Sequence, residues 1–362
     1  MRNRKLDVII PAYKGHKTIW QTISSIASQT IISDIETTIV NDCCPGGNYQ
    51  EFVKMFSPYM KIKEVNTDKN GGPGVARQKG IDSTNNEYIA FIDDDDVFYS
   101  ATAIETLRNA IEEPVISANG QLAQNSFAYV TSPFIESAKS MFLHPNGDTI
   151  YMHGKLYRRD FLDKYKVHFS ELRAGEDVGF NTWVRMLCNM PENLANDIDV
   201  VTYLYKDRAD SVSRINNYQY QYDKGFCGLV DNLIYAFKHV QSNNIPNSIF
   251  NKFLISRMII LYYDYISCLK DMPVFAAQAW EYIKKFYHAV YEPAKNAILD
   301  QELFNEFAID SVNKKLRNNL MYNIFSMSIQ EFMRKLETEE YNSTNIPEEL
   351  KQNVAESSYC PE

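Results

Sequence analysis

The first half of the chain alternates short apolar runs with segments of helical spacing. Residues 6–12 form an almost continuous apolar run, which is typical of a strand buried on both faces. Further strands are predicted over residues 36–41, 61–65 and 88–92, and helices over 18–30, 74–81 and 100–113, with one more after Gly175. This alternation predicts an α/β domain with a mainly parallel sheet and right-handed crossovers.

The pattern changes near residue 216. Tyr, Phe, Leu and Ile then recur at three- and four-residue spacing, which predicts a helical domain. The last residues are acidic and contain Asn, Ser, Thr and Pro, a composition typical of a flexible tail. We therefore predict an α/β domain over 1–214, a helical domain over 215–338 and a flexible acidic tail over 339–362. Because the helical domain has no chemical motif, core packing is its default role, with acceptor binding or oligomer formation as the alternative.

Composition excludes several classes of protein. The chain has 362 residues, of which 45% are hydrophobic and 23% charged, so it can bury a core and is not disordered as a whole. Its net charge of −9 argues against a generally basic nucleic-acid binder, although the helical half is slightly basic.

Neither the ends nor the cysteines point to export or to a membrane. The most apolar stretch, residues 253–269, contains Arg257 and Asp264, which favours a buried helix over a membrane span. The six cysteines have no metal-binding spacing. We therefore expect no transmembrane segment and a reduced, cytoplasmic protein. A peripheral position at the membrane is an alternative, as is the host cytoplasm if the chain is phage-encoded.

Four consecutive aspartates, Asp93 to Asp96, directly follow the predicted strand 88–92. Four carboxylates repel one another unless solvent, cationic partners or a bound divalent ion compensates them. Oxygen-only ligands suit Mg²⁺ or Mn²⁺, and these ions commonly share their shell with phosphates. The alternative is a solvated acidic loop, which the position after a buried strand makes less attractive.

The other predicted strands also end in residues suited to a nucleotide. The first ends in Pro11-Ala12-Tyr13 and the second in Asn41-Asp42, while the third leads to the glycine-rich segment NGGPGVAR at 70–77. An aromatic side chain can stack on a base, and a glycine-rich helix start lets the backbone approach a phosphate. Each feature alone also fits a turn or a helix cap.

Taken together, these motifs resemble glycosyltransferase family 2 on the GT-A fold. The matching segments are VIIPAY at 8–13, IVND at 39–42, NGGPGVAR at 70–77 and FIDDDD at 91–96. The resemblance covers residues 5–213, and it implies a Rossmann-like sheet domain followed by the helical domain. It also implies an inverting transferase with a nucleotide-sugar donor, UDP being the expected nucleotide.

The resemblance implies roles for individual residues. Tyr13 and Asp42 would hold the base and ribose, and Asp93 and Asp95 would be the D-x-D positions that bind Mn²⁺ or Mg²⁺. The remaining donor-binding positions implied are Pro11, Gly72, Arg77, Asp93, Asp94 and Arg208. The segment DCCPG at 42–46 departs from the family's usual Asp-Gly-Ser turn, so base contacts are expected to differ.

A second acidic motif, Glu176-Asp177, opens the helix after Gly175. Two acids in a first helical turn are also ordinary caps. The resemblance implies that Asp177 is the general base that deprotonates the acceptor hydroxyl, with Glu176 orienting it. It also implies that His153 and Asp96 contact the acceptor, although a lone histidine is more often structural.

Several functions stay open at this stage. The expected acceptor is a glycan, a wall polymer or a lipid-linked oligosaccharide, and less readily a hydroxymethylated DNA base. A Mg²⁺-dependent nucleotidyltransferase is the first alternative, but the segment PAYKG at 11–15 is too short for its phosphate loop. A non-catalytic nucleotide- or glycan-binding module is the second.

Overall fold

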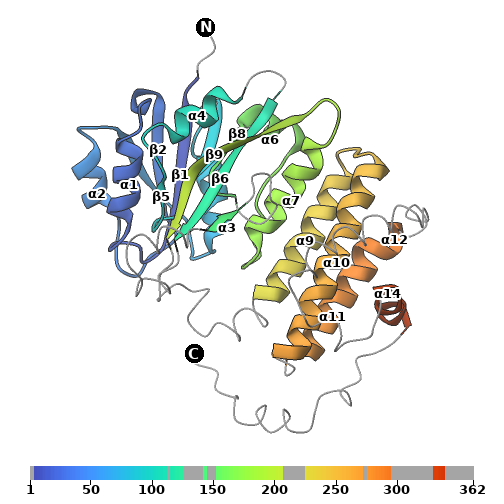
Figure 1. The fold of residues 1–362 in the computed structure, drawn as a ribbon. Helices are drawn as coiled ribbons and strands as arrows, with labels where there is room; N and C mark the ends of the chain where they lie inside the picture. Colours follow the sequence, from blue (N-terminus) through green and yellow to red (C-terminus); the bar gives the residue numbers. More distant parts are fainter. Residues whose placement is uncertain are drawn as a thin grey trace. The chain divides into compact units, whose positions relative to one another are not determined.

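The structure is a computed structural model, and it describes residues 4–111, 115–125, 142–144, 152–206, 225–271, 275–294 and 329–338. The chain divides into two compact units, Met1–Ile215 and Asn216–Glu362. Both are drawn in Figure 1. Arg208 and the predicted tail 339–362 lie outside the described residues.

The described part of the first unit is built on one sheet of nine strands (Figure 1). The strands are β1 (Leu6–Ala12), β2 (Ile35–Asn41), β3 (Lys61–Asn66), β4 (Tyr88–Phe91), β5 (Val97–Phe98), β6 (Val115–Asn125), β7 (Phe142–His144), β8 (Lys155–Arg158) and β9 (Leu194–Lys206). Their order is β3-β2-β1-β4-β8-β6-β9-β5, and β7 pairs with β6.

The first four strands are parallel, as predicted, with β1 between β2 and β4. Their carboxyl ends therefore lie at one edge of the sheet, where ligands gather in α/β folds. The later strands differ, because β8 runs antiparallel to both β4 and β6, and β5 runs antiparallel to β9. The predicted class, an α/β domain with a mainly parallel Rossmann-like core, is confirmed.

Helices connect these strands. They are α1 (Ile19–Ala27), α2 (Gln50–Phe56), α3 (Pro73–Asp82), α4 (Ala103–Asn109), α6 (Arg159–Tyr165) and α7 (Glu176–Cys188). The predicted helix 18–30 is shorter in the structure and ends at Ala27. Sequence analysis did not anticipate α2, which is only seven residues long and buries the single residue Phe52.

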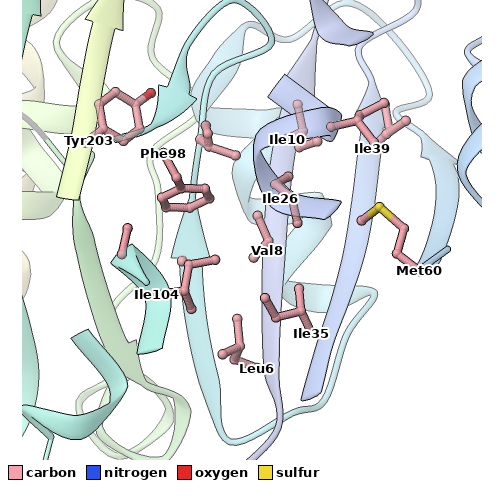
Figure 2. Close-up of a cluster of buried hydrophobic side chains, with 14 of the residues drawn as sticks. Leu6, Val8, Ile10, Ile26, Ile35, Ile39, Met60, Phe98, Ile104 and Tyr203 are labelled. Carbon is pink, nitrogen blue, oxygen red and sulfur yellow. The ribbon is translucent and has the colours of Figure 1, made fainter. Parts of the chain in front are cut away.

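The main core lies on one face of the sheet. Leu6, Val8 and Ile10 alternate along β1 and pack with Ile26 of α1 and Ile104 of α4 (Figure 2). The two-residue period of a strand sends the intervening side chains to the opposite face. Because that face is covered as well, every residue of β1 is buried.

Aromatic side chains fill part of the opposite face. Phe91, at the end of β4, makes edge-on contacts with Phe169 and with Phe180 of α7, at centroid distances of 5.6 and 6.2 Å. Phe169 and Phe180 stack on each other at 4.3 Å. Such pairs add about 0.5–1.5 kcal/mol each beyond the burial of their area. They hold α7 beside the carboxyl end of β4.

The described part of the second unit is helical, which confirms the predicted helical region. It contains α9 (Phe226–Gln241), α10 (Asn247–Asp271), α11 (Ala276–Phe286), α12 (Glu292–Ala294) and α14 (Ile329–Thr338). Phe237 packs edge-on against Phe250 and Phe286, so these aromatic residues form core. Among the helices that the structure describes, none combines the length and apolarity needed to cross a bilayer.

Candidate active site

The glycine-rich segment is fixed to the end of β2 by Asp42. The Asp42 carboxylate accepts hydrogen bonds from the hydroxyl of Thr67 at 2.9 Å and from the backbone N–H groups of Gly71 and Gly72 at 3.0 and 2.8 Å. Asp42 is only 3% exposed. In this structure Asp42 therefore fixes the loop before α3. Its predicted contact with a nucleotide base stays a prediction.

Helix α3 begins at that loop. Gly72 adopts a φ of +90°, a conformation that disfavours side chains, and Pro73 occupies the first helical turn, where its missing N–H costs nothing. The free N–H groups at a helix N-terminus form an anion-binding site. The segment can therefore present backbone donors to a phosphate.

Arg77 of α3 joins the two acidic motifs. One guanidinium nitrogen donates to Glu176 Oε1 at 2.8 Å and another to Asp93 Oδ1 at 2.7 Å. The Arg77 side chain is 3% exposed, so both ion pairs are shielded from water. Because a guanidinium is planar and presents several fixed donors, one residue can hold a carboxylate on each side. Arg77 thereby sets the separation between the ends of β4 and α7.

Asp93 has a second basic partner in His153. The Nε2 atom of His153 lies 3.1 Å from Asp93 Oδ2, and the histidine is 5% exposed. Burial alone would raise the pKa of Asp93, but the charges of His153 and Arg77 hold that pKa below its usual range. Asp93 is therefore ionised near neutral pH, with a basic side chain at each oxygen.

Asp94 faces the loop that follows β1. Its Oδ2 accepts a hydrogen bond from the backbone N–H of Tyr13 at 3.2 Å. A Cβ atom placed on Gly15 would overlap the Asp94 carboxylate, so this close approach requires glycine at position 15. The Tyr13 ring is 42% exposed and can stack on a ligand. Asp94 thus fixes the backbone that carries this exposed ring.

Asp96 is fully buried and held by β9. The hydroxyl of Tyr203 donates to Asp96 Oδ2 at 2.7 Å, and the backbone N–H of Lys206 donates to Oδ1 at 2.8 Å. Burial, together with the charges of Asp95 and Asp93, raises the pKa of Asp96 to about 8. With 0% exposure, its carboxylate has no surface to offer an acceptor in this structure, and its predicted acceptor contact stays a prediction.

Three of the four aspartates converge. Asp93, Asp95 and Asp96, here called the acidic cluster, each bring a carboxylate oxygen within 4.8 Å of the others. Oxygen donors at such spacing fit a hard divalent cation such as Mg²⁺ or Mn²⁺. Asp93 and Asp95, the two partly exposed members of the cluster, could hold such a cation.

Glu176 and Asp177 form the first turn of α7, as predicted. Glu176 pairs with Arg77, while Asp177 accepts a hydrogen bond from the N–H of Val178 at 2.8 Å. Burial and the neighbouring Glu176 charge raise the pKa of Asp177 to about 7, against the opposing charges of Arg77 and His153. A carboxylate with a pKa near neutral can accept a proton at physiological pH.

The predicted site residues that the structure describes thus lie at one edge of the sheet, and their surroundings differ. Asp93, Arg77, His153 and Glu176 form a continuous ionic chain. Pro11 is buried within β1 rather than presented to solvent. Sequence analysis overlooked Tyr203, which lies in a strand without a motif and looks like an ordinary core residue.

The amino-acid sequence also matches a known protein family. Residues 7–166 match the family model described as "Glycosyl transferase family 2". This segment contains β1 to β4, the glycine-rich loop, the aspartates and His153. It ends before the Glu176-Asp177 motif.

Curated relatives are glycosyltransferases, several of them named for poly(ribitol-phosphate). The chain is 27% identical over 187 residues to the poly(ribitol-phosphate) beta-N-acetylglucosaminyltransferase TarS of Staphylococcus aureus, covering 48% of this chain and 31% of that protein. It is 24% identical over 311 residues to a poly(ribitol-phosphate) beta-glucosyltransferase of Bacillus spizizenii, covering 82% and 46% respectively. The chain therefore spans less than half the length of these two relatives.

Solved structures show the same fold. A crystal structure of S. aureus TarS 1-349 in complex with UDP-GlcNAc matches with a TM-score of 0.65 and 18% sequence identity, covering 86% of this chain and 91% of that one. The match extends well beyond the segment 7–166 recognised by the family model. The family match over residues 7–166 and the shared fold together support glycosyl transferase family 2 with a GT-A fold for this chain.

Proposed function

We propose that the chain is an inverting, metal-assisted glycosyltransferase that moves a sugar from a UDP-sugar to a hydroxyl group of a glycan or wall polymer. The observation that carries this proposal is the double ion pair of Arg77 with Asp93 and Glu176. It ties the acidic cluster, which suits a diphosphate-bound cation, to the helix that begins with Glu176 and Asp177.

Asp177 is the general base in this proposal. Its carboxylate accepts the proton of the acceptor hydroxyl as that oxygen attacks the anomeric carbon. Attack on the side opposite the departing diphosphate inverts the configuration at that carbon, the same stereochemical logic as in inverting glycosidases. A pKa of about 7 keeps a substantial fraction of Asp177 ionised near neutral pH.

The donor side rests on the acidic cluster and the start of α3. A bound Mn²⁺ or Mg²⁺ would neutralise the negative charge that develops on the diphosphate. Asp95 and Asp93 are its proposed carboxylate ligands, and the N–H groups at the start of α3 donate to phosphate oxygens. The exposed ring of Tyr13 stacks on the base.

The proposed acceptor follows from the relatives, two of which act on poly(ribitol-phosphate) by name. A polyol-phosphate chain offers hydroxyl groups without an aromatic base or a lipid tail. We therefore propose that the acceptor is a hydroxyl-rich wall polymer or surface glycan. We also propose that the reaction takes place in the reduced cytoplasm, where nucleotide-sugars are used.

The experiment is a UDP-release assay with a panel of UDP-sugars and Mn²⁺, with and without poly(ribitol-phosphate). Wild-type protein should release UDP slowly alone and faster with acceptor. Asp177→Asn should reduce transfer about 10²–10⁴-fold, the usual contribution of a general base. Asp82→Asn, at an exposed aspartate on the far end of α3, is the matched control and should leave the rate unchanged. Release of pyrophosphate instead of UDP would contradict the proposal in favour of nucleotidyl transfer.

A further inference from the structure

We propose that Tyr203 is a positioning residue that holds the acidic cluster in its metal-binding arrangement. The inference rests on the proposed metal-assisted function and extends it to β9, a strand that carries no recognised motif. Tyr203 has 0% exposure, so it acts on a ligand only through the residues that it contacts.

The hydroxyl of Tyr203 lies between two aspartates of the cluster. It donates to Asp96 Oδ2 at 2.7 Å and accepts from the backbone N–H of Asp93 at 3.3 Å. One buried hydroxyl thus sets both the side-chain orientation of Asp96 and the backbone position of Asp93.

The ring of Tyr203 positions a third site residue. It stacks on the imidazole of His153 at a centroid distance of 4.8 Å with 23° between the planes. His153 in turn lies 3.1 Å from Asp93 Oδ2. The ring also meets Phe98 of the main core edge-on, at a centroid distance of 6.3 Å. Because the ring is itself packed in the core, it fixes the orientation of the His153 imidazole relative to Asp93.

The strand pairing explains why β9 controls the aspartate loop. The loop leaves β4 at Phe91 and enters β5 at Val97, and β5 pairs with β9 so that Phe98 lies opposite Tyr203. The backbone N–H of Lys206, three residues further along β9, donates to Asp96 Oδ1 at 2.8 Å. Both oxygens of Asp96 are thus fixed by one strand from outside the loop.

Removing the hydroxyl frees one oxygen of a carboxylate that lies beside two others. The Asp96 side chain can then turn away from Asp93 and Asp95, and a cation that binds must restore the arrangement, which lowers its affinity. Residues that hydrogen-bond to metal ligands without touching the metal typically affect metal affinity by about 10–100-fold. We expect a loss in that range for Tyr203→Phe, which keeps the ring and its stacking.

The test compares Tyr203→Phe with Tyr157→Phe. Tyr157 is a matched control because it is 1% exposed and its hydroxyl donates to another side chain, Asn181 Oδ1, at 3.0 Å. The apparent Mn²⁺ affinity is measured by thermal unfolding over a MnCl₂ series at fixed UDP. Steady-state UDP release gives kcat and the KM for the UDP-sugar in parallel.

Tyr203→Phe should weaken the apparent Mn²⁺ affinity about 10–100-fold, the range typical of groups that orient metal ligands. Its kcat at saturating Mn²⁺ should fall less, because excess cation restores the arrangement. Tyr157→Phe should keep the wild-type Mn²⁺ dependence even if it unfolds at a lower temperature. Wild-type Mn²⁺ affinity in Tyr203→Phe, or equal losses in both variants, overturns the role of Tyr203 alone. A wild-type chain that Mn²⁺ does not stabilise overturns both this role and the metal-assisted function.

Discussion

At the scale of single residues, charge balance organises the candidate site. Arg77, at 3% exposure, is the buried cation that links Asp93 to Glu176. Removing one partner of such a buried pair commonly costs about 3–5 kcal/mol, because the remaining charge stays without compensation. The site therefore depends on the shape of the guanidinium as well as on its charge.

Arg77→Lys tests that dependence. Lysine keeps the positive charge, but its single ammonium group cannot hold two carboxylates in the fixed geometry of a fork. We expect transfer activity to fall about 100-fold, comparable to the loss from misplacing reacting groups by about 1 Å. Arg185→Lys is the control, since Arg185 also pairs with a carboxylate, Asp197, through two nitrogens but outside the site. Equal activity of the two variants would refute this role of Arg77.

The pKa of Asp177 predicts the pH dependence of transfer. Burial and Glu176 raise that pKa to about 7, and only the ionised carboxylate can accept the acceptor's proton. Lowering the pH protonates the base, so kcat should fall about tenfold per pH unit below pH ~6, as for any single essential base. A kcat profile measured from pH 5 to 9 at saturating donor and Mn²⁺ checks this. A flat profile between pH 5 and 8 would exclude Asp177 as the base.

At the scale of elements, the first turns of α3 and α7 meet. A Cβ atom on Gly74 would lie 2.8 Å from Glu176 Cγ and 3.2 Å from the backbone oxygen of Ser170. Both helix N-termini therefore approach the same place, and their dipoles favour negative charge there. This arrangement suits the diphosphate in the proposed function.

Gly74→Ala should disturb this contact. The added methyl group forces Glu176 and the start of α7 away from α3, which costs about 1–3 kcal/mol as in other overpacked interiors. Transfer activity should fall as well, because Asp177 moves with that turn. Denaturant unfolding and UDP release measure the two effects, with Lys79→Ala on the same helix as control. An unchanged stability of Gly74→Ala would show that the turn accommodates the methyl group.

Sequence patterns reveal some of these elements more readily than others. The strands 6–12 and 88–92 could be predicted because strands covered on both faces are nearly all apolar, as β1 is. The link between Arg77 and Glu176 could not, since 99 residues separate them and the pattern of neither segment specifies its partner. Tyr203 was overlooked for the same reason, because its role arises only when β9 pairs with β5.

At the scale of the whole molecule, the net charge of −9 includes a cluster of carboxylates at one edge of the sheet. A divalent cation should stabilise the folded chain, because it relieves repulsion that exists only when the cluster is assembled. Ligand at 100 times its Kd adds about 2.7 kcal/mol to the free energy of unfolding. In a unit of this size, each kcal/mol raises Tm by about 2–4 °C.

We therefore expect Mn²⁺ with UDP to raise Tm by several degrees and EDTA to abolish UDP release. Asp95→Asn should remove most of the Mn²⁺-dependent shift, while Asp160→Asn, at an exposed aspartate on α6, should keep it. The measurement is differential scanning fluorimetry with MgCl₂ and CaCl₂ as further cations. Full UDP release in EDTA would show that the reaction needs no cation.

The contact between Asp94 and Gly15 has a practical consequence for anyone altering the sugar that this chain accepts. Because Asp94 secures the backbone of the Tyr13 loop, randomising the aspartate run would alter both the proposed metal site and the proposed stacking of Tyr13 on the nucleotide in the same clone. A mutagenesis library that keeps Asp94 and Gly15 constant would separate the two effects.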